Sequence, residues 1–214
     1  QLTSQQMEGI LKGAELSGTL AGEAPYKQQE VESKLAENRK DRQMDIIFDI
    51  DGTLLDISNR LHLLKKTPPD WEEFRNPLQK RWDEPRLPII NIAVALEKAG
   101  HNLLFCSGRR ESEREDTLES LSRFFLMPML WMRRDKDYRP DTEVKAEILE
   151  IIRSPDVKFP GHTPDPDPMV GRVFATGNSK GFNPVMAFDD RPSVIRMWRE
   201  KGLIVADVGN GVEF

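Results

Sequence analysis

The stretch Phe48-Asp49-Ile50-Asp51-Gly52-Thr53 decides how the rest of this 214-residue sequence is interpreted. It completes an apolar run, Ile46-Ile47-Phe48, that is typical of a buried strand. Asp49 and Asp51 then stand two positions apart, where open α/β sheets place their ligand sites. Two carboxylates this close need a cation between them or a proton on one of them. The pair predicts a nucleophile beside an acid/base, with a divalent metal bridging the site.

Three further segments carry polar groups in a similar setting. Ser107-Gly108-Arg109 follows a second apolar run, Lys145 lies in a helical pattern over 142–149, and Asp189-Asp190 ends a third apolar run. Each has a purely structural alternative: an acidic turn, a helix cap at Ser107 or a solvated helix face at Lys145. Taken in series, they predict one catalytic site at the edge of a parallel sheet.

Strand and helix patterns alternate along the chain. Strands are predicted at 45–50, 101–106, 129–132, 185–188 and 203–206, with helices at 89–99, 111–125, 144–153 and 192–201. This alternation predicts an α/β fold, a parallel sheet with helices on both faces.

With the four motifs in this order over about 140 residues, the sequence resembles the haloacid dehalogenase (HAD) superfamily of phosphohydrolases. The resemblance implies a Rossmann-like fold in which Asp49 attacks phosphorus and forms an aspartyl-phosphate. Asp51 is implied to protonate the leaving oxygen and then to activate water. Ser107 is implied to donate to a phosphoryl oxygen, and Lys145 to neutralise the nucleophile and the transferred group.

The same resemblance implies a magnesium ion. Its ligands would be Asp49, the backbone carbonyl of Asp51, and Asp189 or Asp190. Hard oxygen ligands beside phosphate are what Mg²⁺ prefers.

Several positions are similar to the 3′-phosphatase half of bacteriophage polynucleotide kinase/phosphatases. They cover residues 44–153 and 185–214 and include Arg60 after the first motif, Ser107-Gly108-Arg109, the pattern from Arg133 to Leu149, and Asp189-Asp190-Arg191. This resemblance implies that Arg60, Arg109 and Asp141 assist catalysis and that Arg133 and Arg139 contact a nucleic-acid backbone. Thr53 and Gly108 complete the predicted substrate-binding set.

Two segments depart from that family. Residues 1–43 form an extension, predicted to be one or two marginal helices that pack on the body or a partner, or else a disordered tail. The phosphatase domain is predicted at 44–214, with a lid-like, proline-rich insert at about 65–88. Its Pro/Gly-rich loop at 154–184 makes the spacing between Lys145 and Asp189 unusually long. No G-x-x-x-x-G-K-[ST] pattern of a P-loop kinase occurs in the sequence.

The composition is that of a soluble chain with one sizeable core. Charged residues make up 31%, no apolar run approaches a membrane span, and no secretory signal is visible, so we expect a cytoplasmic protein without a membrane partner. The only cysteine, Cys106, ends an apolar run and is predicted to pack as a small hydrophobe. The net charge of −5 does not indicate nucleic-acid binding, although arginines cluster at 133–139.

Three functions remain open from the sequence. The leading one is a Mg²⁺-dependent phosphatase that removes 3′-phosphates from DNA or RNA ends in nucleic-acid repair. The second is a phosphatase of nucleotides or other small phosphomonoesters. The third, of another class, is a partner-binding protein on a HAD scaffold, with residues 1–43 as the docking or self-association element.

Overall fold

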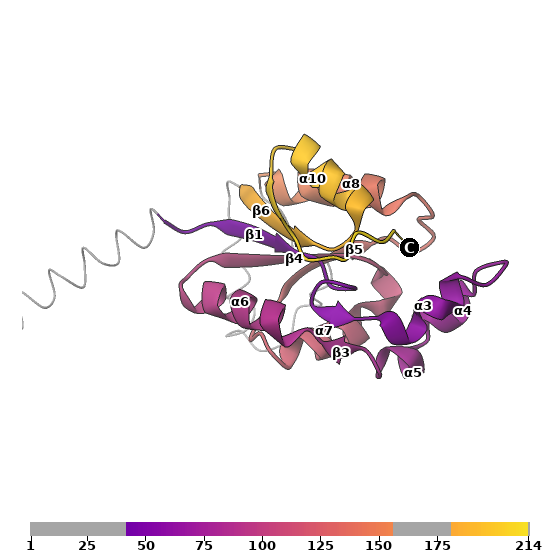
Figure 1. The fold of residues 1–214 in the computed structure, drawn as a ribbon. Coiled ribbons are helices and arrows are strands. Elements are labelled where there is room, and N and C mark those ends of the chain that lie inside the picture. Colours follow the sequence, from indigo (N-terminus) through magenta and orange to yellow (C-terminus); the bar gives the residue numbers. More distant parts are fainter. Residues whose placement is uncertain (1–41, 156–180, 214) are drawn as a thin grey trace, which may run out of the picture. The chain divides into compact units, whose positions relative to one another are not determined.

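The structure is a computed structural model that describes residues 42–155 and 181–213 (Figure 1). The predictions made for the N-terminal extension up to residue 41, and for residues 156–180 of the Pro/Gly-rich loop, lie outside the described residues.

A five-stranded parallel sheet forms the centre of the fold, as predicted. Its strand order is β5-β4-β1-β6-β7, and every neighbouring pair runs parallel. The strands are β1 (Asp45–Phe48), β4 (Asn102–Arg110), β5 (Met129–Arg133), β6 (Pro184–Asp189) and β7 (Ile204–Asp207).

Helices cover both faces of this sheet. Figure 1 shows α8 (Asp141–Arg153) and α10 (Pro192–Glu200) on one face, and α6 (Leu87–Lys98) and α7 (Arg114–Ser122) on the other. Side chains of β1 alternate between the two layers, because successive residues of a strand point to opposite faces. Ile47 packs in the core beneath α8 and α10, whereas Ile46 and Phe48 pack in the core beneath α6 and α7.

The strand order reverses at β1, and this reversal places the site. The chain runs outward from β1 to β4 and β5, then returns to β6 on the other side of β1. Ligand crevices of open α/β sheets lie at such a switch point, outside the carboxyl ends of the strands. The crevice therefore lies where β1 ends, directly at Asp49.

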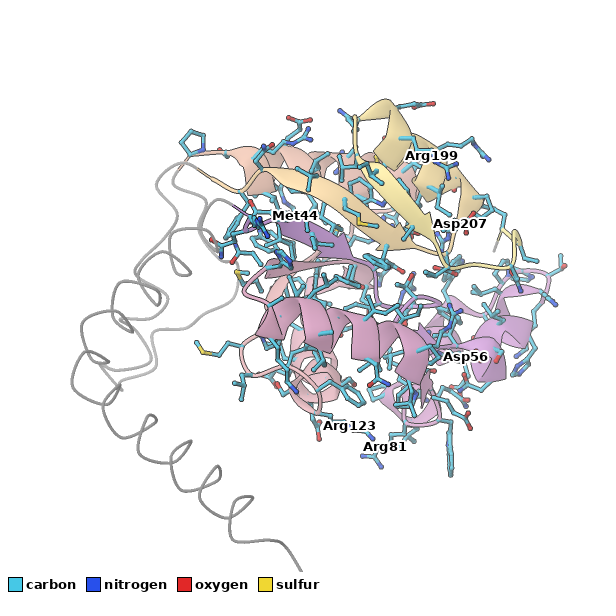
Figure 2. The ribbon with its side chains drawn as sticks, turned by 60° about the vertical axis from the view of Figure 1, so that its left-hand side comes forward. Met44, Asp56, Arg81, Arg123, Arg199 and Asp207 are labelled. Atoms are coloured by element: carbon cyan, nitrogen blue, oxygen red, sulfur yellow. The ribbon has the colours of Figure 1, made fainter. Side chains whose placement is uncertain are left out.

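An insert of short elements, residues 55–85, follows β1 at this same end. It contains β2 (Leu55–Asp56), α3 (Ser58–Leu64), α4 (Trp71–Arg75), α5 (Pro77–Lys80) and β3 (Glu84–Pro85), and β2 pairs antiparallel with β3. Figure 2 shows Met44, just before β1, at the end where β1 begins, and Asp56 and Asp207 toward the opposite end of the strands. The insert thus lies at the carboxyl ends of the strands.

The three large aromatic side chains of this insert differ in burial. Phe74 is buried and packs with Ile57 and Leu63 in a small core of its own. Trp71 and Trp82, in contrast, are 46% and 75% exposed. A lid function for this segment stays a prediction.

The expectation for the single cysteine is met. Cys106 is fully buried, and burial raises the pKa of its thiol well above the usual range, so it packs as a hydrophobe. Within the described ranges, no helix has both the length and the apolar character needed to cross a bilayer.

Candidate active site

Asp49 and Lys145 form a buried ion pair at the carboxyl end of β1. Lys145 Nζ donates to Asp49 Oδ1 at 2.7 Å and to Asp189 Oδ2 at 2.9 Å. Lys145 belongs to α8 and Asp189 is the last residue of β6, so three segments distant in sequence meet here. The structure therefore brings together the motifs that were expected to share one site.

Three carboxylates surround this single ammonium. Asp49, Asp189 and Asp190 each place an oxygen within 4.8 Å of the others. Burial raises the pKa of Asp49 in spite of the Lys145 charge, and burial together with Asp189 raises the pKa of Asp190 to about 6. A buried surplus of negative charge on hard oxygen atoms suits a divalent cation such as Mg²⁺. These residues therefore fit the expected metal.

Neighbouring groups hold two of these carboxylates in place. Trp198 Nε1 donates to Asp189 Oδ2 at 3.0 Å, and Thr53 Oγ1 donates to Asp190 Oδ1 at 3.3 Å. Gly52 has a φ of +87°, and a Cβ there would lie 2.1 Å from Asp190 Oδ2. Only glycine fits this turn. The buried Thr53 hydroxyl is committed to Asp190, and the substrate contact expected of this residue stays a prediction.

Two arginines hold the side chain of Asp51. Arg109 donates from Nε to Oδ2 at 2.9 Å and from Nη2 to Oδ1 at 2.5 Å, and Arg60 Nη2 donates to Oδ1 at 2.8 Å. Burial raises the pKa of Asp51, but the Arg109 and Arg60 charges outweigh it and hold this pKa well below the usual range. Asp51 is therefore ionised in the resting protein.

A fourth member of this network, Asp83, was missed in the sequence. It is buried and accepts two bonds from Arg60, at 2.8 Å each, while Arg109 Nη2 lies 3.4 Å from its Oδ2. Asp83 could have been found only indirectly, because a buried arginine such as Arg60 requires a buried carboxylate partner. Asp83 lies in the irregular insert, where no periodic pattern marks it as buried.

Replacing Asp83 tests whether it positions the two arginines. We expect Asp83→Asn to lower kcat by about 10- to 100-fold, the range seen when a residue that orients a catalytic group is removed. KM should change little, and the acidic limb of the pH–rate profile should move, because Arg60 and Arg109 then act on Asp51 alone. The control is Glu84→Gln, an exposed neighbour. A lowered unfolding temperature with unchanged kcat and pH profile would contradict the positioning role.

A second network surrounds Asp141, at the first turn of α8. Arg191 Nη1 donates to Asp141 Oδ2 at 2.7 Å, and Arg133 Nη2 donates to its other oxygen. A Cβ on Gly108 would lie 2.6 Å from Asp141 Oδ1. Gly108 therefore makes room for this carboxylate, and its substrate contact stays a prediction. Arg191 lines the cavity that opens over Asp49 and Lys145, although the sequence pattern predicts no role for it.

The arginines expected to contact nucleic acid are engaged with protein. Arg133 is buried and donates to the carbonyls of Gly108, Asp137 and Arg139 at 3.0, 3.2 and 2.6 Å. Arg139 pairs with Asp137 at 2.6 Å and with Glu147. The Arg133 guanidinium therefore braces the loop before α8 from inside. The substrate contacts of Arg133 and Arg139 both stay predictions.

Ser107 lies within β4, at the same edge of the sheet. It is buried, and its Oγ accepts a bond from the Arg109 backbone N–H at 3.2 Å. Across the described residues no protein acceptor takes the hydroxyl proton, so Ser107 is able to donate to a bound oxygen. Donation to a phosphoryl oxygen stays a prediction.

A cavity of about 610 Å³ opens over these groups. Asp49, Asp51, Lys145 and Asp190 line its inner part. Its volume lies in the usual range for ligand pockets and is far larger than one phosphoryl group requires. The cavity therefore has room for the group that carries the phosphate.

Comparisons with known proteins agree with this geometry. Residues 43–154 match the family model described as the polynucleotide kinase PNKP phosphatase domain. Two solved structures share the fold: the Pnkp1/Rnl/Hen1 complex, at a TM-score of 0.52 and 21% identity, and the Pnkp1/Rnl/Hen1 RNA repair complex, at 0.51 and 22%.

Each of these matches covers 79% of this chain, but only 47% and 44% of the chain it matches. This chain thus spans less than half the length of those proteins. The family model covers more than half of the present sequence and includes Asp49, Asp51, Ser107 and Lys145. The chain therefore belongs to the PNKP phosphatase-domain family of HAD-type phosphohydrolases.

Proposed function

We propose that this protein is a Mg²⁺-dependent phosphatase that removes 3′-phosphates from polynucleotide ends through an aspartyl-phosphate on Asp49. One observation carries the proposal: the buried Asp49–Lys145 pair lies at the floor of a cavity that also holds Asp51 with its two arginines. This arrangement supplies a nucleophile, a fixed positive charge and a proton-transfer group within one site.

Asp49 is oriented for attack by its ion pair. Lys145 holds Oδ1, and in the described part of the chain no donor contacts Oδ2, which is left to attack phosphorus. Lys145 remains charged in spite of burial, because Asp189 and Asp49 raise its pKa. Its charge stabilises the equatorial oxygens of the transferred group, as most catalysis of phosphoryl transfer requires. Magnesium, held by Asp49, Asp189 or Asp190, would supply further neutralisation of phosphate charge.

Asp51 handles the protons of the two steps. In the resting state it is ionised by Arg109 and Arg60, which is the state needed to accept a proton from the attacking water. A phosphate bound beside Arg109 competes for that guanidinium and adds negative charge, and both effects raise the pKa of Asp51. Asp51 is then able to carry the proton that the leaving oxygen takes in the first step.

The polynucleotide substrate is supported by the family match and by the volume of the cavity. RNA is included beside DNA because one of the similar structures is an RNA repair complex. Association with ligase-like or other repair proteins is proposed on the same ground, and residues 1–43 are its proposed docking element.

Phosphate release from four substrates tests this function. They are an oligonucleotide with a 3′-phosphate, as DNA and as RNA, a 5′-phosphorylated oligonucleotide, and a 3′-mononucleotide. We expect the 3′-phosphorylated oligomers to be the best substrates with Mg²⁺, and release to stop in EDTA because the carboxylate cluster then lacks its counterion.

Other outcomes separate the alternatives. A preference for the mononucleotide would place the protein among small-molecule phosphatases. Release that persists in EDTA would contradict the metal requirement but not the phosphatase activity. No release from any substrate would refute the proposal and favour a binding role on this scaffold.

A further inference from the structure

The outer half of the active-site cavity is walled by two exposed aromatic rings. Trp71, from α4, is 46% exposed, and Tyr138, from the loop before α8, is 78% exposed. Trp71 is positioned by edge contact with the buried Phe74, at a centroid distance of 5.8 Å. Large rings left in water beside a catalytic pocket are unfavourable for folding and are typical of binding surfaces.

Each of these rings is covered on one side by an arginine. The guanidinium carbon of Arg75 lies 4.9 Å from the Trp71 ring centroid, and that of Arg110 lies 5.4 Å from the Tyr138 ring centroid. We call these four residues, Trp71, Arg75, Arg110 and Tyr138, the outer pocket.

The two arginines of the outer pocket form no ion pair among the described residues. Over residues 42–155 and 181–213, no carboxylate lies within ion-pair distance of Arg75 or Arg110, and the buried Nε of Arg110 has no hydrogen-bond partner. The nearby Glu113 is paired with Lys80. Burial and the charge of Arg110 lower the pKa of Arg75, as expected where like charges crowd together. The Glu113 carboxylate, which lines both cavities at this surface, offsets part of this positive charge but forms no ion pair with Arg75 or Arg110.

A second cavity adjoins the first at these residues. It has a volume of about 330 Å³, and Trp71, Arg75, Arg110 and Glu113 line both cavities. A molecule whose phosphate lies at Asp49 would therefore leave the site across the outer pocket. Space that continues beyond one ligand-sized cavity suits a chain better than a single small molecule.

We propose that the outer pocket binds the last nucleotides of an unpaired strand, with bases stacked on Trp71 and Tyr138 and a phosphodiester on Arg75 and Arg110. Aromatic platforms interleaved with cationic groups are the means by which proteins hold single strands without reading their sequence. Stacking on an exposed ring requires an unpaired base, so the site selects single-stranded 3′ ends over blunt duplex ends. This inference rests on the proposed function and specifies its substrate.

The test compares substrates that differ only in what reaches the outer pocket. We would measure kcat/KM for acetyl phosphate, which has no aromatic ring, and for 3′-phosphorylated single strands of one, two and four nucleotides, as DNA and RNA. A longer 3′-phosphorylated strand would be compared as a single strand and in a blunt duplex. In the wild type we expect kcat/KM to rise with length and to be higher for single strands than for the duplex.

Variants of the rings should remove this rise. In Trp71→Ala or Tyr138→Ala the ratio of kcat/KM for the tetramer to that for acetyl phosphate should fall by about 5- to 100-fold, the loss of one stacked base. Trp71→Phe, which keeps a ring, should retain most of the ratio. Trp82→Ala is the matched control, because Trp82 is an exposed tryptophan of the same insert that lines neither cavity.

Variants of the arginines should change the salt dependence. In Arg75→Gln or Arg110→Gln the slope of log(kcat/KM) for the tetramer against log[salt] should become shallower by about 0.7 for each phosphate that the protein no longer neutralises. Arg81→Gln is the control; Arg81 is exposed, as Figure 2 shows, and lines neither cavity.

The outcomes separate this inference from the function it rests on. If the wild type cleaves acetyl phosphate but no strand, the polynucleotide function itself fails. If the wild type prefers 3′-phosphorylated strands while the outer-pocket variants behave like Trp82→Ala and Arg81→Gln, the inference is wrong and the function stands. Equal turnover of blunt duplex and single strand would also overturn it.

Discussion

Asp49→Asn is expected to lower phosphate release by at least about 10³-fold, because an amide cannot form the phosphoenzyme. The substitution keeps the shape of the side chain, and Lys145 retains Asp189 at 2.9 Å as a counterion. Folding should not suffer: burial raises the pKa of Asp49, so its ionised form is less favourable in the folded protein than in the unfolded one. The unfolding temperature should therefore stay the same or rise.

The measurement is steady-state phosphate release, together with thermal unfolding of the same preparation. Asp207→Asn is the matched control, since Asp207 also ends a parallel strand at this edge of the sheet but is exposed, with its carboxylate accepting a bond from the Gly209 backbone N–H. If the Asp49 variant were as active as the Asp207 variant, Asp49 would not be the nucleophile.

Lys145→Met is the second change with a large expected effect, and it acts on both activity and stability. Removing the ammonium leaves the carboxylates of Asp49, Asp189 and Asp190 together in a buried site. Breaking a buried pair by removing one partner costs about 3–5 kcal/mol of unfolding free energy. Loss of the charge that faces the phosphoryl group should lower kcat by at least about 10²-fold.

Denaturant unfolding in EDTA and in Mg²⁺ measures the stability effect. We expect the loss to be larger in EDTA, because a bound cation partly replaces the missing charge. Lys201→Met is the control: its pair with Glu150, at 3.3 Å, is exposed, and such pairs contribute less than about 1 kcal/mol. Similar losses in the two variants, in EDTA, would contradict the buried carboxylate cluster.

The convergence of the catalytic motifs was predictable because it follows from one topological rule. Asp49, Ser107 and Asp189 each lie where an apolar run ends, and parallel strands bring their carboxyl ends to one edge. Lys145 lies on the first turns of a helix that follows another strand, and its place in the site was implied by the resemblance in motif order. The inferences for the strand ends use only the direction of strands and the periodicity of side chains.

The partners of the charged residues were not predictable in this way. Arg133 lies in a basic run that indicates a solvated patch, yet it folds inward onto three backbone carbonyls and Asp141. Asp83 lies in an irregular segment, yet it is the buried counterion of Arg60. A charge run has no periodicity, so the sequence does not tell which guanidinium is buried and which remains free.

The cap of α8 shows the same limit at a smaller scale. The sequence predicts Asp141 or Thr142 as the helix cap, but the helix begins at Asp141 after Pro140, and no side chain caps it. The Asp141 carboxylate is held by Arg133 and Arg191 instead. Local propensity was overridden by two ion pairs that only the folded chain provides, one with a residue of the preceding loop and one with the distant Arg191.

The sequence by itself determined the parallel α/β fold and the meeting of Asp49, Ser107 and Asp189 at one edge of the sheet, because hydrophobic periodicity and strand ends are local properties of the chain. The order of its motifs indicated the family by resemblance. Only the tertiary structure decided which cations pair with buried carboxylates and which line the cavity without such a partner. In the folded chain, Arg60 and Arg109 pair with Asp51 and Asp83, and Arg133 donates to backbone carbonyls of the loop before α8. Arg75 and Arg110 lie instead beside two exposed aromatic rings. The physical reason is that burial and pairing of a charge depend on groups far away in sequence, which meet only when the sheet and its insert are assembled.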